Sequence, residues 1–175
     1  MFMLALAKRL RAQDRAVREA RWDRQAEVLG SEIEGRTLGI IGLGHSGREL
    51  ARLVAPFSMR VLAFSPHAEA ARTEAIGVRL TSLEELLRES DFVSLHCRLS
   101  EETRRLLSAE RFAQMKPSAF LVNVARGELI DEAALVEALS DGRIAGAGLD
   151  VFEHEPLPAG HPLTLLETVI LAPHW

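Results

Sequence analysis

The sequence predicts an α/β protein built on a doubly wound parallel sheet, with a long helix at its N-terminus. From Thr37 onward, short apolar segments alternate with segments of helical periodicity, an order typical of right-handed β–α–β crossovers. The apolar segments have few polar positions, as expected for strands covered by helices on both faces. The expected strands are Leu38–Gly42, Arg60–Phe64, Phe92–Leu95, Ala119–Val122, Ile144–Leu149 and Val169–Leu171.

The spacing of apolar residues between these strands predicts the helices. They are Arg48–Ala55, Leu83–Glu89, Ala109–Gln114 and Glu132–Ser140, with weaker helical content over 68–75. No solenoid-type repeat or low-complexity linker divides the chain. We therefore expect one domain over residues 1–175.

Residues 1–30 are more basic than the rest, with seven Lys and Arg against four Asp and Glu. Met3, Leu6, Leu10 and Val17 keep approximately helical spacing, which predicts one long amphipathic helix. Its charged face is either a solvated surface or a contact with a partner subunit.

The composition excludes several classes of function. The 175 residues are 47% hydrophobic and 26% charged, and the net charge of -4 gives no general basic footprint for nucleic acid. The single cysteine, Cys97, excludes an internal disulfide and offers no metal framework, so we expect a reducing cytoplasm and no metal site. The apolar start, residues 1–7, is too short to span a bilayer, and its basic residues follow it, so we expect no membrane partner.

The first expected strand leads into a glycine-rich turn with the pattern G-x-G-x-x-G, formed by Gly42, Gly44 and Gly47. In such a turn the first glycine permits the tight bend, the second lets the backbone approach a pyrophosphate, and the third lets the helix pack on the strand. The N-terminus of the following helix favours phosphate charge. An incidental glycine turn is the alternative, but the strand before and the helix after favour a dinucleotide site on a Rossmann-like fold.

The end of the second strand bears on which dinucleotide binds. An acidic residue usually accepts the ribose hydroxyls of NAD there, but Ser65 occupies the position and the nearest acid is Glu69. A serine can donate to a 2′-phosphate, and His67 or Arg72 would add positive charge, which slightly favours NADP. The alternative is that Ser65 binds the ribose of NAD and His67 is solvated.

Three later segments lie at strand ends: 123–131 (NVARGELID), 148–156 (GLDVFEHEP) and 171–174 (LAPH). Together with the glycine turn, they resemble the D-isomer-specific 2-hydroxyacid dehydrogenase family over essentially the whole chain, including Trp22. The resemblance implies the NAD(P)-binding domain of an oxidoreductase of the glyoxylate/hydroxypyruvate reductase type. Such an enzyme transfers a hydride between a nicotinamide cofactor and a small 2-hydroxy or 2-oxo acid.

The resemblance also implies three catalytic residues. Arg126 matches the arginine that binds the substrate carboxylate, His174 matches the acid/base, and Glu155 matches the carboxylate that pairs with that histidine. General chemistry agrees, because a guanidinium binds a carboxylate bidentately and a carboxylate favours a charged imidazolium. The ordinary alternatives are a loop or capping role for Arg126, a surface histidine and a loop carboxylate.

The remaining matches line the cofactor, and Asp150 falls near the nicotinamide carboxamide. Small residues over 146–148 are expected to leave room for a ligand there, although Asp150 could also be a simple turn former. We assign no chemistry to His96, His154 or His161. The implied cofactor contacts are Gly42, Gly44, His45, Ser46, Gly47, Ser65, Cys97, Val124, Ala125, Arg126, Asp150 and His174.

The sequence departs from the family pattern in two respects. Arg98 stands where the family commonly has proline, and no segment matches the family's substrate domain, so we expect weak activity or none from the chain alone. The main alternative is a dinucleotide-responsive binding module like the related corepressors. Formate dehydrogenase is disfavoured, because that branch typically carries glutamine in place of Glu155. The family pairs through this domain, which implies a homodimer with its contact in residues 1–30.

Overall fold

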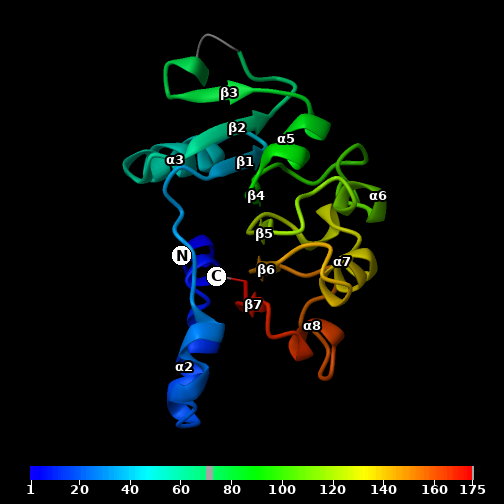
Figure 1. The fold of residues 1–175 in the computed structure, drawn as a ribbon. Coiled ribbons are helices and arrows are strands. Elements are labelled where there is room, and N and C mark those ends of the chain that lie inside the picture. Colours follow the sequence, from blue (N-terminus) through cyan, green and yellow to red (C-terminus); the bar gives the residue numbers. More distant parts are fainter. Residues whose placement is uncertain (70–72, 175) are drawn as a thin grey trace.

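Seven parallel strands form one sheet in the computed structural model, which describes residues 1–69 and 73–174 (Figure 1). Their order is β3-β2-β1-β4-β5-β6-β7, so the chain runs outward from β1 in one direction and then returns to build the other half from β4. This reversal is the switch point of a doubly wound sheet. The strands are β1 (Thr37–Ile41), β2 (Arg60–Phe64), β3 (Val78–Leu80), β4 (Phe92–Leu95), β5 (Phe120–Asn123), β6 (Gly146–Leu149) and β7 (Val169–Leu171).

Helices cover both faces of the sheet and enclose two apolar clusters. Alternate side chains of a strand point to opposite faces, so Ile40 joins the cluster beneath α1 and α3, whereas Ile41 joins the cluster beneath α5, α6 and α7. The described α-helices are α1 (Phe2–Ala7), α2 (Leu10–Arg18), α3 (His45–Val54), α5 (Leu83–Glu89), α6 (Ala109–Phe112), α7 (Glu132–Ser140) and α8 (Pro162–Leu165). The 3-10 helices are η1 (Trp22–Val28), η2 (Ala55–Phe57) and η3 (Gly127–Leu129).

The structure confirms the fold class and the six predicted strands, with small shifts at their ends. The sequence did not predict β3, an edge strand of three residues of which only Val78 is buried, so it lacks the continuous apolar run of an inner strand. The helix predicted over 68–75 includes residues 70–72, and these lie outside the described residues, as does the proposed contribution of Arg72.

The prediction of one long N-terminal helix was wrong. The segment forms α1, α2 and η1 in succession, and Arg9 between the first two has a left-handed backbone with φ of 49°. α1 buries Phe2, Met3 and Leu6 on the sheet, whereas α2 buries no residue and extends away from it (Figure 1). The chain must turn at Arg9 because only the first of these helices lies on the core.

The contact of α1 with the sheet depends on a glycine in β6. A Cβ atom at Gly148 would lie 2.7 Å from the Cβ atom of Phe2, closer than any real contact. The small residues before Asp150 were expected to admit a ligand. This was also wrong for Gly148, because its vacant side-chain position receives Phe2.

We expect Gly148→Ala to lower the free energy of unfolding by about 1–3 kcal/mol, because the added methyl group overpacks the core against Phe2. Urea denaturation followed by circular dichroism would measure the change. Gly44→Ala is the matched control, since a Cβ atom there meets nothing within 4 Å and its φ of -74° suits alanine. Equal stability of the two variants would contradict the packing of α1 on β6.

Candidate active site

The carboxyl ends of the strands form one edge of the sheet, and the predicted site residues gather there. Ligands of doubly wound proteins bind at this edge, beside the switch point. The glycine turn follows β1, Ser65 follows β2 and Cys97 follows β4. Residues 124–126 follow β5, Asp150 follows β6 and His174 follows β7.

The glycine turn has the backbone geometry that its motif requires. Gly42 has φ of +95°, and a Cβ atom on it would lie 2.5 Å from the backbone nitrogen of Cys97. A Cβ atom at Gly47 would lie 2.4 Å from the carbonyl oxygen of Gly42, so the helix meets the turn without a side chain between them. Gly44 instead faces open space and is exposed.

The first turn of α3 fits a phosphate. His45 and Ser46 begin this ten-residue helix and are exposed, and the N–H groups of a first helical turn have no partner within the helix. Such groups and the helix dipole attract an anion. The residues present therefore fit the pyrophosphate of a dinucleotide. Ser65 lies next to this turn, because the N–H of Gly42 donates to the carbonyl oxygen of Phe64 over 2.9 Å.

A hollow with a volume of about 430 Å³ lies between the loops that follow β4 and β5. Burial raises the pKa of the Cys97 thiol, so this side chain stays uncharged near neutral pH. Arg98, the departure from the family pattern, also lines the hollow. The lining residues are Ser46, His96, Cys97, Arg98, Leu99, Val124, Ala125 and Arg126.

Asn123, a residue to which the sequence analysis gave no role, holds the loop that carries Arg126. Its side chain is fully buried; the Nδ2 group donates to the carbonyl oxygen of Arg126 over 2.8 Å, and Oδ1 accepts from the N–H of Ala125. Its carbonyl oxygen also accepts from the N–H of Asp150. The loops after β5 and β6 are thus joined through one amide residue. An asparagine at the end of a buried strand, three residues before the arginine, was the available signal.

Arg126 itself is exposed, and its Nη1 group donates to the carbonyl oxygen of Ala125 over 2.6 Å. The next residue, Gly127, is buried against the loop after β6. A Cβ atom at Gly127 would lie 1.9 Å from the carbonyl carbon of Phe152, so no other residue fits there without moving the backbone. Direct backbone contact thus brings Arg126 close to the loop that carries Glu155.

Glu155 and His174 form a hydrogen-bonded pair. The Nδ1 atom of His174 lies 2.6 Å from Oε2 of Glu155, while Oε1 of Glu155 accepts from the N–H of Phe152 over 3.0 Å. The bond with His174 holds the pKa of Glu155 below its usual range, with smaller contributions from the Phe152 N–H and from the charges of His174 and Arg126. The structure therefore brings all three predicted catalytic residues to one region.

The pair lines a second hollow of about 590 Å³. Apart from the pair itself, its walls are apolar. The residues that line this hollow are Phe152, Glu155, Pro156, Leu157, Leu171, Ala172, Pro173 and His174.

Two of the histidines without assigned chemistry lie outside these hollows. His154 is exposed, and His161 caps α8, since its Nδ1 accepts from the N–H of Leu163 and its Nε2 lies 3.2 Å from Oε1 of Glu132. Within residues 1–69 and 73–174, no cluster of three or more His, Cys, Asp or Glu side chains could hold a metal ion. None of the helices in these ranges is long and apolar enough to cross a membrane.

Comparison with known proteins defines the class. The chain belongs to the D-isomer specific 2-hydroxyacid dehydrogenase family, whose NAD binding domain matches residues 1–175. This confirms the family inferred from the four motifs.

Individual relatives and solved structures support the same family assignment. The glyoxylate reductase of Korarchaeum cryptofilum is 46% identical over 98% of this chain and 53% of that protein. Among solved structures, the TT0316 protein from Thermus thermophilus is 42% identical, with a TM-score of 0.90 over 98% of this chain and 54% of its own. An acyclic imino acid reductase in complex with NADPH and D-Arg is 31% identical, with a TM-score of 0.89 over 98% of this chain and 54% of its own. The chain thus spans about half the length of these relatives.

We expect His174→Phe to raise the pKa of Glu155 toward its usual range, because phenylalanine cannot donate a hydrogen bond and the largest cause of the lowering is removed. A carbon-13 NMR titration of the Glu155 carboxyl group in both proteins would measure this. A carboxyl group whose pKa is lowered by folding stabilises the fold above its unfolded pKa, and this stabilisation is lost as the pH falls through the folded value. The wild-type protein should therefore lose more stability than the variant on acidification below the usual glutamate range. An unchanged pKa of Glu155 would show that the pair does not form in solution.

Proposed function

We propose that the chain is the cofactor-binding domain of a 2-hydroxyacid dehydrogenase, acting in the cytoplasm. It would transfer a hydride between a nicotinamide dinucleotide and a small 2-hydroxy or 2-oxo acid. The observation that carries the proposal is that Arg126 lies near the Glu155–His174 pair, close enough for its charge to act on Glu155. All three residues lie on the edge of the sheet that also bears the glycine turn. The glyoxylate reductase among the relatives supports the reaction class.

The geometry suggests how the residues divide the chemistry. Because Nδ1 of His174 is bonded to a carboxylate oxygen, that nitrogen carries a proton and Nε2 is left to exchange a proton with the substrate oxygen. Glu155 orients the ring and stabilises its charged form. Arg126, whose guanidinium is exposed, would bind the substrate carboxylate and stabilise negative charge on the reacting oxygen. The bound nicotinamide supplies or accepts the hydride.

The chain by itself offers only one wall of a cleft. The side chains of His174 and Glu155 remain 46% and 35% exposed. Efficient hydride transfer requires water to be excluded and the substrate to be held in place. We therefore propose that a separate substrate domain closes the site and reads the substrate side chain.

To test the function, oxidation of NADH and NADPH by glyoxylate or hydroxypyruvate would be followed by absorbance, for this chain and for a longer protein that includes a substrate domain. We expect turnover in the longer protein, and a loss of about 10²–10⁴-fold in kcat for its His174→Phe variant, because general acid catalysis is removed. Arg126→Lys should raise KM, because a lysine cannot bind a carboxylate bidentately. Full activity of the His174→Phe variant, or no turnover of the longer protein with any 2-oxo acid, would refute the proposal.

For the cofactor we propose NADP(H), with NAD(H) also accepted, because Ser65 and not an acid follows β2. The imino acid reductase bound to NADPH is a relative with the same fold. We expect Ser65→Asp to weaken NADPH binding at least about tenfold, through repulsion of the 2′-phosphate, and to leave NADH binding nearly unchanged. Calorimetric titration of both cofactors decides the question. Tighter binding of NADH than of NADPH by the wild-type chain would overturn the preference.

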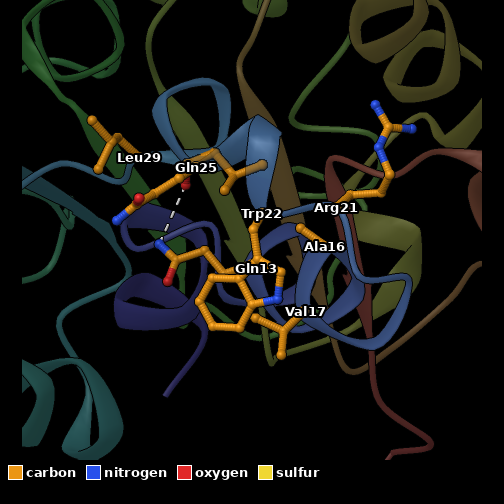
Figure 2. A pocket seen from close by; sticks show the side chains of 8 residues that line it. Gln13, Ala16, Val17, Arg21, Trp22, Gln25 and Leu29 are labelled. Carbon is orange, nitrogen blue, oxygen red and sulfur yellow. Dashed lines mark hydrogen bonds between the residues drawn. The ribbon is translucent and has the colours of Figure 1, made fainter.

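For the assembly we propose a homodimer formed through α2 and η1. Val17 on α2, Trp22 on η1 and Leu29 just after η1 are each more than half exposed around a hollow of about 220 Å³ (Figure 2). Gln13 joins the two elements, because its Nε2 group donates to the carbonyl oxygens of Lys8 and Val28. Exposed apolar side chains gathered in this way are typical of a contact with another protein.

Light scattering at micromolar concentration would test the assembly. We expect a dimer for the wild-type chain and a monomer for Trp22→Asp, because a buried unpaired charge opposes association. Leu165→Asp, which alters an exposed leucine on α8, is the control and should remain dimeric. A monomeric wild-type chain would exclude this contact. Dimerisation that requires the cofactor, without turnover in the longer protein, would instead favour the corepressor-like module.

A further inference from the structure

Three polar side chains connect the interior of the sheet to the first turn of α3. Ser94 lies on β4 and is buried, and its Oγ atom lies 2.9 Å from Nε2 of His96. On the other side of the ring, Nδ1 of His96 lies 2.9 Å from Oγ of Ser46. The sequence analysis left His96 without a role, yet it lines the same hollow as Arg126.

The buried serine determines which ring nitrogen carries the proton. A neutral imidazole has one donor and one acceptor nitrogen. Within the described part of the chain, Nε2 of His96 is the one hydrogen-bond partner of the Ser94 hydroxyl group. A buried hydroxyl proton needs an acceptor, so Nε2 accepts and Nδ1 carries the proton. Burial lowers the pKa of His96, which keeps the ring neutral near neutral pH.

This tautomer orients the Ser46 hydroxyl group. Since Nδ1–H donates to Oγ of Ser46, the serine's own proton is free to point elsewhere. Ser46 is exposed in the first turn of α3, where backbone N–H groups and the helix dipole favour an anion. With the opposite tautomer, Ser46 would donate to the ring and present only lone pairs to that anion.

We propose that His96 is a positioning residue for dinucleotide binding. Held by Ser94, it fixes the Ser46 hydroxyl group with its proton directed at the cofactor pyrophosphate. This inference rests on the proposed binding of a nicotinamide dinucleotide at the glycine turn.

The tautomer is measured first, in the chain without cofactor, by nitrogen-15 NMR of the His96 ring. We expect the signature of a ring protonated at Nδ1, and a mixture of tautomers in Ser94→Ala. A wild-type ring protonated at Nε2 would overturn the inference.

The effect on binding is measured by calorimetric titration with NADH. His96→Asn and His96→Gln form a matched pair, because an asparagine amide reaches the place of Nδ1 whereas a glutamine amide reaches the place of Nε2. We expect Ser46→Ala and His96→Gln each to weaken binding about tenfold, and His96→Asn to retain affinity within about threefold. The double variant Ser46→Ala/His96→Gln should bind no more weakly than Ser46→Ala alone, because both changes remove one interaction.

Two outcomes would count against the proposal in different ways. Wild-type affinity in the His96→Gln variant would overturn the role of His96 and leave cofactor binding intact. Failure of the wild-type chain to bind either NADH or NADPH would overturn both this inference and the proposed function. Ser46→Ala provides an independent measure, because its exposed side chain has no part in the core.

Discussion

Direct contact between backbones at the carboxyl edge of the sheet is the constraint on which the rest of the structure depends. Gly42 lies against the backbone at Cys97, and Gly127 lies against the backbone at Phe152. A methyl group at either position would force two loops apart, and protein interiors have little room to absorb such a change. These two backbone contacts join loops from distant parts of the chain. They therefore fix the relative positions of the side chains on those loops without any ligand.

The polar groups at this edge form two systems with different burial. Asn123 and His96 are held within the protein by hydrogen bonds at both ends of their side chains, so they orient backbone and hydroxyl groups. Arg126, Glu155 and His174 are instead exposed to solvent. The groups that shape the site are thus separate from the three residues that we propose to act on the substrate, and the electrostatic interactions of those three would strengthen once water is excluded.

The sequence predicted those features that follow from local pattern. Inner strands such as β4 are buried along their whole length because both faces are covered, and Gly42 and Gly47 of the turn stand where backbone segments approach closely. The break at Arg9 was not predictable, because the apolar spacing of residues 1–17 is helical on both sides of it and only contact with the sheet distinguishes them. The prediction for Gly148 failed for a similar reason. A glycine indicates that another group approaches closely, but the sequence does not show whether that group is a ligand or a side chain such as Phe2. The role of Asn123 required knowledge of which loops meet.

The contact between Phe2 and Gly148 connects α1 to a strand that leads to the candidate site, although α1 is far from the site motifs in sequence. The strand that receives Phe2 ends at Leu149, just before Asp150, and the elements that follow α1 bear the surface that we propose as a dimer contact. β6 therefore both receives the side chain of Phe2 and leads into the loop that begins with Asp150. A change in how α1 packs on β6 would therefore reach the loop that begins with Asp150 through a single strand.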